Sequence, residues 1–431
     1  MKKIFTFLFV CILFVGNTFA GGFHTGTQGA RAMGMGHAFV GMAADASAIY
    51  FNPAGLTQLK GMNILLGSTF IMPKVDFTGP NPSVVTATTP IPPTTSTVSR
   101  TFTPINFYGV YGMENGLSFG IGVYNPYGLG SEWPSNWIGK SLAVKTELVT
   151  FYINPTVAYQ VSDNFSIGVG FNYIISNVKF YQVIDIPTIP LAPGVSLPGA
   201  ANVGVNLEGN GDAAYSFSAG LLFKPTKDLS LGASYRHSAE ITFNGDLTFT
   251  GLNAKPAGFP VGQADLFPSG PGVAKITMPS DLRFGASYNA TEDFTVNADI
   301  QFVGWSSYKE LAANFEKNTA AWADLKSVKN WENSVTYRVG AEYRMDKLAL
   351  RVGYVRDGSP IPTKYMDPSL PGNDRNEYNV GVGYQITQNI RVDAAYEYIS
   401  FENVVTNSAI PFNGKYKNST NIFGINLGFG F

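Results

Sequence analysis

The residues of this chain with the most obvious chemical capability are three histidines, His24, His37 and His237. An imidazole can bind a metal ion or act as a general base, but both roles need partner residues at a suitable spacing. His24 and His37 stand thirteen residues apart, and no carboxylate motif lies beside either of them. The single cysteine is Cys11. The sequence therefore favours no enzymatic activity, and it predicts no metal site and no cofactor.

A larger group of charged residues recurs along segments in which polar and apolar residues alternate. These charges share one face of each segment with glycine and serine, while valine and aromatic residues occupy the other face. The group consists of Arg236, Arg283, Asp299, Arg338, Glu342, Arg351, Arg391, Asp393 and Glu397. Two interpretations are open: some of these residues contact a ligand, or they pair with one another and stiffen a wall. We favour the wall network, which groups Arg338 with Glu342 and Arg391 with Asp393 and Glu397, and which also includes Arg351.

A ligand that carries a carboxylate would need a cationic partner, because charge-assisted hydrogen bonds to arginine or lysine are the strong ones. The partner should lie near the outer third of the protein. Lys179, which follows the apolar run Phe171–Val178, and Arg236 are the candidates.

The charged residues depend for their positions on β-strands. In residues 281–290, Leu282, Phe284, Ala286 and Tyr288 alternate with Arg283, Gly285, Ser287 and Asn289. The same period of two recurs in residues 294–302, 335–343, 378–386 and 390–398. Strict alternation over this length predicts strands with one apolar and one polar face.

The composition indicates that these strands cross a membrane. Charged residues make up 14% of the chain, against about 25% in soluble domains, and aromatic residues make up another 14%. After residue 20, no apolar run approaches the roughly 20 residues that a membrane helix needs. The pattern therefore predicts a membrane protein built from strands.

The first 20 residues have the pattern of a secretory signal. Lys2 and Lys3 precede the apolar segment Ile4–Val15, and Thr18–Ala20 offers a small-residue cleavage site. Removal of this segment leaves 27 basic and 30 acidic residues, a net charge of −3, and no cysteine. The mature chain thus has no disulfide, and its charge gives no indication of nucleic-acid binding.

The connections between strands alternate in length. Six short turns are expected at residues 114–116, 162–164, 226–228, 291–293, 346–347 and 387–389. Seven long loops are expected at residues 75–100, 131–141, 184–209, 250–273, 310–327, 358–373 and 405–417. Together they separate fourteen antiparallel strands in the layout of an outer-membrane barrel, which must close because lipid cannot satisfy an open sheet edge. A soluble sandwich or propeller is disfavoured, because its outward faces would be charged.

The predicted barrel occupies residues 61–431 and ends in a strand whose terminal aromatic residue, Phe431, resembles the signal read by the barrel assembly machinery. A fourteen-stranded barrel is wider than the roughly eight-stranded limit at which wall side chains fill the interior. Residues 21–60 precede the first strand, are rich in small residues and have low strand propensity. We expect them to form short helices and to plug the barrel from within, as a hatch.

Two short segments contain proline and glycine where a helix or strand would otherwise continue. Asn52-Pro53-Ala54 is either a plain turn that caps a helix or a rigid wedge; we favour the wedge, because proline fixes φ and asparagine can bind nearby backbone. Asn125-Pro126-Tyr127-Gly128 either ends the third strand or leaves a gap in the wall. We favour the gap, because proline removes a ladder donor and glycine marks a bulge.

The segment NPAGL at residues 52–56 resembles the hatch signature of the FadL/TodX family of outer-membrane transporters for long-chain fatty acids and other hydrophobic compounds. Further similarity lies in SFGIGVYNPYGLGSEW (118–133), GDAAYSFSAGLLF (211–223), TYRVGAEYR (336–344) and LRVGYVRDGSPIP (350–362). The order and spacing of these motifs extend the resemblance over nearly the whole mature chain.

The resemblance implies a passive uptake path. A hydrophobic small molecule or fatty acid collects in a pocket of the outer loops, the hatch moves, and the ligand leaves sideways at the third-strand kink into the membrane lipid. It also implies the outer membrane of a Gram-negative bacterium, and we expect a monomer. The alternatives are a general porin and a structural or adhesive surface barrel; a porin would need an open lumen.

Overall fold

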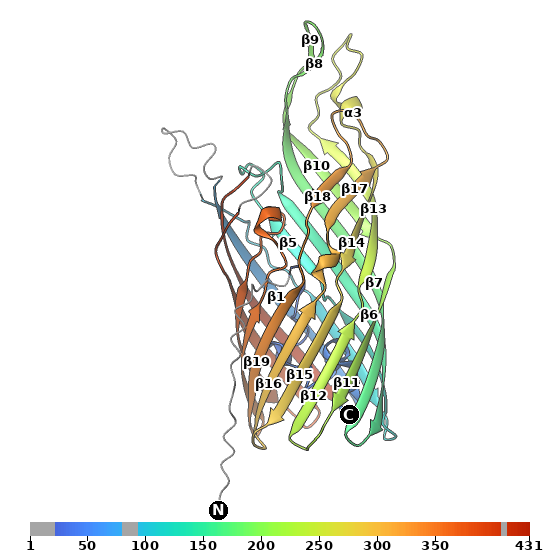
Figure 1. The fold of residues 1–431 in the computed structure, drawn as a ribbon, viewed down its shortest axis with the longest axis vertical. Helices are drawn as coiled ribbons and strands as arrows, with labels where there is room; N and C mark the ends of the chain where they lie inside the picture. Colours follow the sequence, from blue (N-terminus) through green and yellow to red (C-terminus); the bar gives the residue numbers. More distant parts are fainter. Residues whose placement is uncertain (1–21, 80–93, 407–411) are drawn as a thin grey trace, which may run out of the picture.

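The computed structural model describes residues 22–79, 94–406 and 412–431. The predicted signal segment, residues 1–20, and part of the predicted loop 75–100 lie outside the described residues. The alternating segments form one large antiparallel sheet, which curves until its first and last strands meet (Figure 1).

The sheet closes between β1 (Gly61–Thr78) and β24 (Lys415–Gly430), which pair along sixteen residues. On its other side β1 pairs with β3 (Ile105–Gly112). Closure removes the open edges whose polar groups lipid could not satisfy. Phe431 follows β24, exchanges two backbone hydrogen bonds with Met62 and has an exposed side chain. Its recognition by an assembly machinery stays a prediction.

The ring contains the predicted fourteen strands, and several of them consist of two consecutive segments. After β1 and β3 they are β4 (Leu117–Tyr124) with β5 (Gly128–Glu132), β6 (Lys145–Ser162), β7 (Phe165–Ile186), β10 (Ala200–Gly211) with β11 (Ala214–Phe223), β12 (Leu229–Arg236) with β13 (Ala239–Thr250), β14 (Gly270–Met278) with β15 (Asp281–Asn289), β16 (Phe294–Val303) with β17 (Glu310–Phe315), β18 (Leu325–Val328) with β19 (Ser334–Met345), β20 (Leu348–Asp357), β21 (Arg375–Gln385), β22 (Ile390–Phe401) and β24.

Short elements complete the fold. They are β2 (Thr94–Ser96), the hairpin of β8 (Ile189–Ala192) and β9 (Val195–Leu197), α3 (Gln263–Leu266), η2 (Trp305–Ser307), η3 (Thr363–Tyr365) and β23 (Val404–Val405). Before β1 lie α1 (Ala30–Met33), α2 (Ala48–Phe51) and η1 (Pro53–Gln58). Among the described residues, no helix is long and apolar enough to cross a membrane.

The two faces of the wall are oriented as the alternation predicted. In β19, Tyr337, Val339 and Tyr343 are exposed on the outer face, whereas Arg338 and Glu342 are buried inside. The apolar residues therefore form the surface that meets lipid, and the charged residues face the interior.

The two ends of the barrel differ as expected, but some strands are longer than the sequence predicted. Short turns and the C-terminus lie at one end, and the β8–β9 hairpin, α3 and the strand extensions lie at the other (Figure 1). The predicted loops 184–209 and 310–327 are partly wrong, because they contain much of β10 and all of β17. Here the strands keep pairing beyond the alternating segments, β10 with β7 and β13, and β17 with β14 and β18.

The interior is filled by residues 22–60, which we call the hatch. It contains the short helices α1 and α2, as expected, and its apolar side chains, among them Met35, Phe39, Ile49 and Leu56, are fully buried. Inward-facing glycines of the wall make room for the hatch backbone. A Cβ atom at Gly353 would overlap the backbone nitrogen of Gly36, and one at Gly340 would overlap the carbonyl oxygen of Met35.

We expect Gly353→Ala to displace the hatch without preventing barrel closure, because the clash is with hatch backbone. Overpacking of this kind costs about 1–3 kcal/mol. Ion conductance in planar bilayers should therefore rise in Gly353→Ala. Gly428→Ala is the matched control, since a Cβ there meets only ordinary contacts at 3.6 and 3.8 Å; equal conductance of the two variants would contradict the prediction.

Candidate functional site

The NPA turn joins the hatch to the wall. Asn52 caps η1: its Oδ1 accepts a hydrogen bond from the Ala54 N–H at 3.2 Å, and Pro53 opens the helix. The Asn52 Nδ2 donates to the carbonyl oxygens of Val40 in the hatch and Leu221 in β11, at 3.0 and 2.9 Å. The side chain thus binds nearby backbone, as expected, but the turn lies against β11 rather than against the third-strand kink. Its role as a wedge stays a prediction.

The third strand is interrupted at the predicted kink. The pairing of β4 with β6 ends at Tyr124, and the pairing of β5 with β6 starts again at Gly128. On the other side, β3 follows β4 only as far as Val123. Among the described residues, β5 forms a strand ladder with β6 alone. The wall between β5 and the neighbouring β1 and β3 is therefore not a continuous ladder, and we call this region the wall gap.

The first described hatch residues cover the kink. The Thr25 N–H donates to the Pro126 carbonyl at 2.9 Å, and the Gly128 N–H donates to the Phe23 carbonyl at 3.0 Å. The Thr25 hydroxyl and the Gln28 side-chain amide both donate to the Asn125 carbonyl, at 2.7 and 2.6 Å. Backbone groups that leave the wall ladder at the kink thus find partners in the hatch.

An aromatic cluster holds the same end of the hatch. The Phe23 ring packs against Tyr127, Trp305, Tyr308 and Trp331, with ring centroids 4.6–6.2 Å apart. Phe23 is buried. Tyr127 belongs to the kink, so one aromatic cluster contacts both the gap and the hatch.

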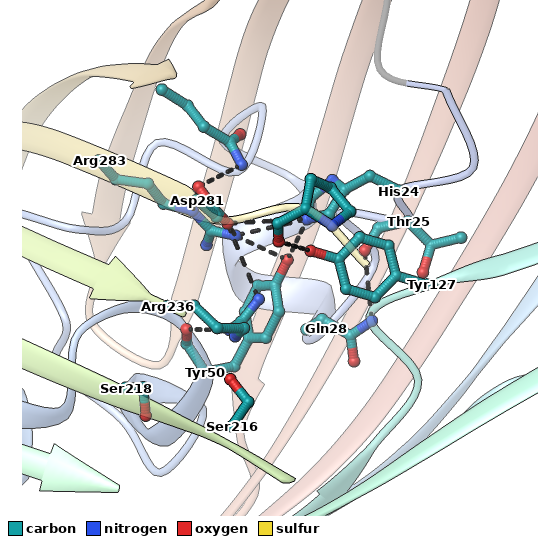
Figure 2. Close-up of polar contacts among 12 residues, drawn as sticks. His24, Thr25, Gln28, Tyr50, Tyr127, Ser216, Ser218, Arg236, Asp281 and Arg283 are labelled. Carbon is teal, nitrogen blue, oxygen red and sulfur yellow. Dashed lines mark hydrogen bonds and ion pairs between the residues drawn. The ribbon is translucent and has the colours of Figure 1, made fainter. Parts of the chain in front are cut away.

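Arg236 contacts the hatch, although its Nε and Nη1 have no hydrogen-bond partner among the described residues. It donates to the Tyr50 carbonyl at 3.0 Å, and its guanidinium lies 4.5 Å from the centroid of the Tyr50 ring. Arg283 lies 4.7 Å from the same centroid and pairs with Asp281 (Figure 2). The Tyr50 hydroxyl is 3.0 Å from the His24 Nε2. All five side chains are buried, and they form a cluster between hatch and wall.

Lys179 lies on the outer face of the wall. It alternates with the inward residues Ser176 and Val178 of β7, and its ammonium group pairs with Glu208 of β10 at 2.8 Å. Both partners are partly exposed. This orientation gives no support to the prediction that Lys179 binds a ligand inside the barrel.

The interior charges form a network that includes the hatch. Glu342 accepts from Arg31 of the hatch and from Arg351, at 2.8 and 2.7 Å. Arg351 also pairs with Asp393 at 2.8 Å. Arg391 pairs with Asp393 at 2.7 Å and lies 3.5 Å from Asp45 of the hatch. The chain of ion pairs therefore starts and ends on the hatch.

The predicted pair of Arg338 with Glu342 is not formed. Residues four apart on a strand are about 13 Å apart along its axis, so the two side chains cannot meet. The Arg338 Nε is buried and has no hydrogen-bond partner among the described residues. Arg338 instead faces a cavity.

This cavity has a volume of about 580 Å³ and lies beside the hatch and the wall gap. Its polar end includes Arg338 and Arg375, and buried apolar residues such as Leu148 line other parts. The outward-facing residues Val149 and Phe151 also line it. The cavity therefore runs from the barrel interior toward the outer face at the kink.

Fold and site together define a class of protein: a fourteen-stranded transmembrane barrel with an N-terminal hatch and a discontinuity in its third strand. Residues 11–431 match the family model described as "Outer membrane protein transport protein (OMPP1/FadL/TodX)". The chain belongs to this family, and it is an outer-membrane protein.

Individual relatives agree with the assignment. The "Long-chain fatty acid transport protein" of Escherichia coli K12 is 24% identical over 423 residues, which cover 92% of each chain. The "Outer membrane protein P1" of Haemophilus influenzae is 24% identical and covers 92% of this chain and 93% of its own. Among solved structures, a Pseudomonas aeruginosa FadL homologue superposes with a TM-score of 0.79 at 20% identity, over 95% of this chain and all of its own. The Pseudomonas putida toluene transporter TodX gives a TM-score of 0.68 at 16% identity, over 90% and 94%.

Sequence reasoning missed the hatch residues that pair with the wall. Between residues 22 and 59 the only charged or imidazole side chains are His24, Arg31, His37 and Asp45. All four contact ionisable wall residues. Isolated charges in a small, apolar plug must be paired when they are buried, and this rule could have identified them.

Burial lowers the pKa of His24 well below its ordinary value of 6.5; Asp281 opposes the shift, and Arg283, Arg236 and Arg338 add to it. The docked hatch therefore holds a neutral imidazole. The imidazole of a released hatch would take up a proton more readily than that of the docked hatch. The stability that neutral His24 gives to the docked hatch is therefore present above about pH 6.5 and is lost as the pH falls. Proteolysis of the hatch should thus accelerate between pH 7.5 and 5.

His24→Gln should reduce this pH dependence, because glutamine does not titrate, whereas His237→Gln, on the outer face, should keep it. Identical pH profiles for wild type and His24→Gln would contradict the assignment.

Proposed function

We propose that this protein takes up hydrophobic molecules passively across the outer membrane and releases them sideways through the wall gap. One observation carries the proposal: a single cavity is lined both by buried interior residues such as Leu148 and by the outward-facing Val149 and Phe151. A ligand in this cavity can move from interior to lipid without entering a water column. Transfer of such a molecule into bulk water costs about 25 cal/mol per Å² of apolar area that becomes exposed.

In this proposal, the ligand enters the cavity from the outer loops. Leu370 and Gly372, in the loop between β20 and β21, line it. The hatch fills the rest of the lumen with buried side chains. This filling disfavours the general porin, because a porin needs an open water channel.

The gate is assigned to residues 22–28 of the hatch. They carry the four hydrogen bonds to the kink and the Phe23 ring contacts. Detachment of this short segment would enlarge the opening at the kink and leave Asn52 and the charged network in place. A hatch movement of this kind needs no energy source if the ligand is consumed inside the cell.

A disulfide across the gate tests the mechanism. His24 and Tyr127 form an antiparallel bridge, and the only native cysteine is Cys11. We expect His24→Cys/Tyr127→Cys to take up a fluorescent long-chain lipophile into lipid vesicles after reduction, and to lose uptake to the level of empty vesicles after oxidation.

The reduced protein serves as the matched control for the oxidised protein, since both have the same composition. Equal uptake in the two states would contradict the gate. Failure of wild type with every lipophile of a panel of fatty acids and aromatic hydrocarbons would contradict uptake itself and favour a structural or adhesive role.

Arg338 replaces Lys179 and Arg236 as the candidate partner for an acidic ligand group, because it lines the cavity and those two residues do not. Its buried Nε has no hydrogen bond among the described residues. Hydrogen bonds to charged groups contribute about 1.5–3 kcal/mol. Arg338→Gln should therefore weaken the binding of a long-chain carboxylate by roughly 10- to 100-fold in a fluorescence displacement assay. The affinity for the alcohol of the same chain length should stay unchanged. Lys179→Gln is the control and should bind both as wild type does. Equal losses for acid and alcohol would contradict the assignment.

A further inference from the structure

Three buried residues with metal-binding side chains meet at the polar end of the cavity. His37 comes from the hatch, Glu377 from β21 and Glu397 from β22. One ligand atom from each residue lies within 4.8 Å of the other two. The His37 Nε2 is 2.8 Å from the Glu397 Oε2. All three residues also line the cavity, which gives them an open side.

The existing bonds of these residues leave atoms available to a cation. Among the described residues, Glu377 uses Oε1 to bind Arg375, at 2.8 Å. Glu397 uses Oε2, which accepts from His37 and from Asn379 at 2.9 Å. The second oxygen of each carboxylate makes no hydrogen bond or ion pair within the described part of the chain. The His37 Nε2 faces Glu397, so a cation would take the place of the proton between these two atoms. The buried Nδ1, which has no hydrogen-bond partner among the described residues, would then carry the proton of the ring.

The charges at this end of the cavity favour a cation. Asp357 and Glu377 share Arg375, at 2.7 and 2.8 Å. No described lysine or arginine lies within 4.0 Å of the Glu397 carboxylate, and His37 is its only ion-pair partner in the described chain. Arg338 lines the same cavity without an ion pair to either glutamate. Buried carboxylates are costly unless a cation or hydrogen-bond donors compensate them.

We propose that His37, Glu377 and Glu397 bind one divalent transition-metal ion. One imidazole and two carboxylates form a donor set that suits zinc, whose bonds to nitrogen and oxygen are about 2.0–2.2 Å long. The three ligand atoms lie within 4.8 Å of one another, so the glutamate side chains would have to rotate to place all three at these distances from one ion. The remaining coordination position faces the cavity, where water or the polar group of a ligand completes it.

The bound ion joins the hatch to two strands of the wall. His37 has a left-handed backbone conformation, with φ at 59°, and follows Gly36, which lies against Tyr354 of β20. This placement holds the imidazole toward β21 and β22. The site therefore strengthens docking of the central hatch, and its existence does not depend on which molecule the protein transports.

Zinc titration of the full mature chain in detergent tests the site. The protein carries no polyhistidine tag and is first stripped with a chelator, and binding is followed by isothermal titration calorimetry and elemental analysis. We expect one zinc ion per wild-type chain. His37→Ala, Glu377→Gln and Glu397→Gln should each lower the zinc affinity by at least about 100-fold, since loss of a supporting second-shell residue already costs 10- to 100-fold.

His237→Ala is the matched control, because this imidazole stacks on Phe217 at the outer face and should not affect zinc binding. Heat-dependent gel mobility shows whether each variant has a closed barrel. If His37→Ala does not fold, the test relies on the conservative variants Glu377→Gln and Glu397→Gln. An anomalous diffraction peak at the zinc edge should lie between the three side chains. Absence of zinc binding by the wild type, undiminished binding by the folded ligand variants, or a peak elsewhere overturns the proposal.

Discussion

The structure depends on one constraint, the width of the barrel. Fourteen strands enclose more space than their own inward side chains can fill, so the wall needs a second body inside it. The hatch meets this need with small residues, which let its backbone approach the wall where β12, β19 and β20 carry inward glycines. Gly232 faces Val40, and Gly353 faces Gly36. Steric fit thus accounts for glycines that would otherwise weaken strands.

The same constraint explains where the charges lie. Inward charges of the wall are buried once the hatch is docked, and a buried charge must be paired. Arg31, Asp45 and His37 of the hatch supply partners that the wall lacks. Because breaking a buried pair costs more than forming it gains, these contacts specify how the hatch sits more than they add to stability.

The sequence was sufficient for the wall, because strands with two unlike faces leave a signal of period two at every residue. The strand number, the short turns and the orientation of the faces follow from that signal. The contacts between hatch and wall could not be predicted in the same way, because they join residues such as Arg31 and Glu342, which are 311 positions apart. The predicted pairing of Arg338 with Glu342 is wrong, because side chains four residues apart meet on a helix but not on a strand.

The candidate site was predicted only in part for a related reason. Proline and glycine mark the kink at Asn125–Gly128 directly in the sequence. Which segment then satisfies the freed backbone groups depends on three-dimensional position, and the answer is Phe23–Gln28 rather than the NPA turn. The prediction that Lys179 binds a ligand inside the barrel is not supported, because side-chain direction alternates along a strand. The Lys179 side chain points to the same outer face of β7 as that of Ile175.

The two ends of the hatch differ in how firmly they are held. Residues 23–28 make four hydrogen bonds to the kink, each with a net contribution of about 1 kcal/mol, and burial of Phe23 adds about 2–3 kcal/mol. A ligand with a micromolar Kd gains about 8 kcal/mol on binding, and it can shift the hatch only by the difference between its affinities for the two states. We propose that this difference detaches the first segment when the ligand and the segment compete for the same apolar surface at Tyr127. The buried contacts of His24 with Tyr50 and Asp281 must break at the same time. We therefore propose that the hatch responds locally at the gap, while the ion-pair network around Glu342 keeps its centre docked.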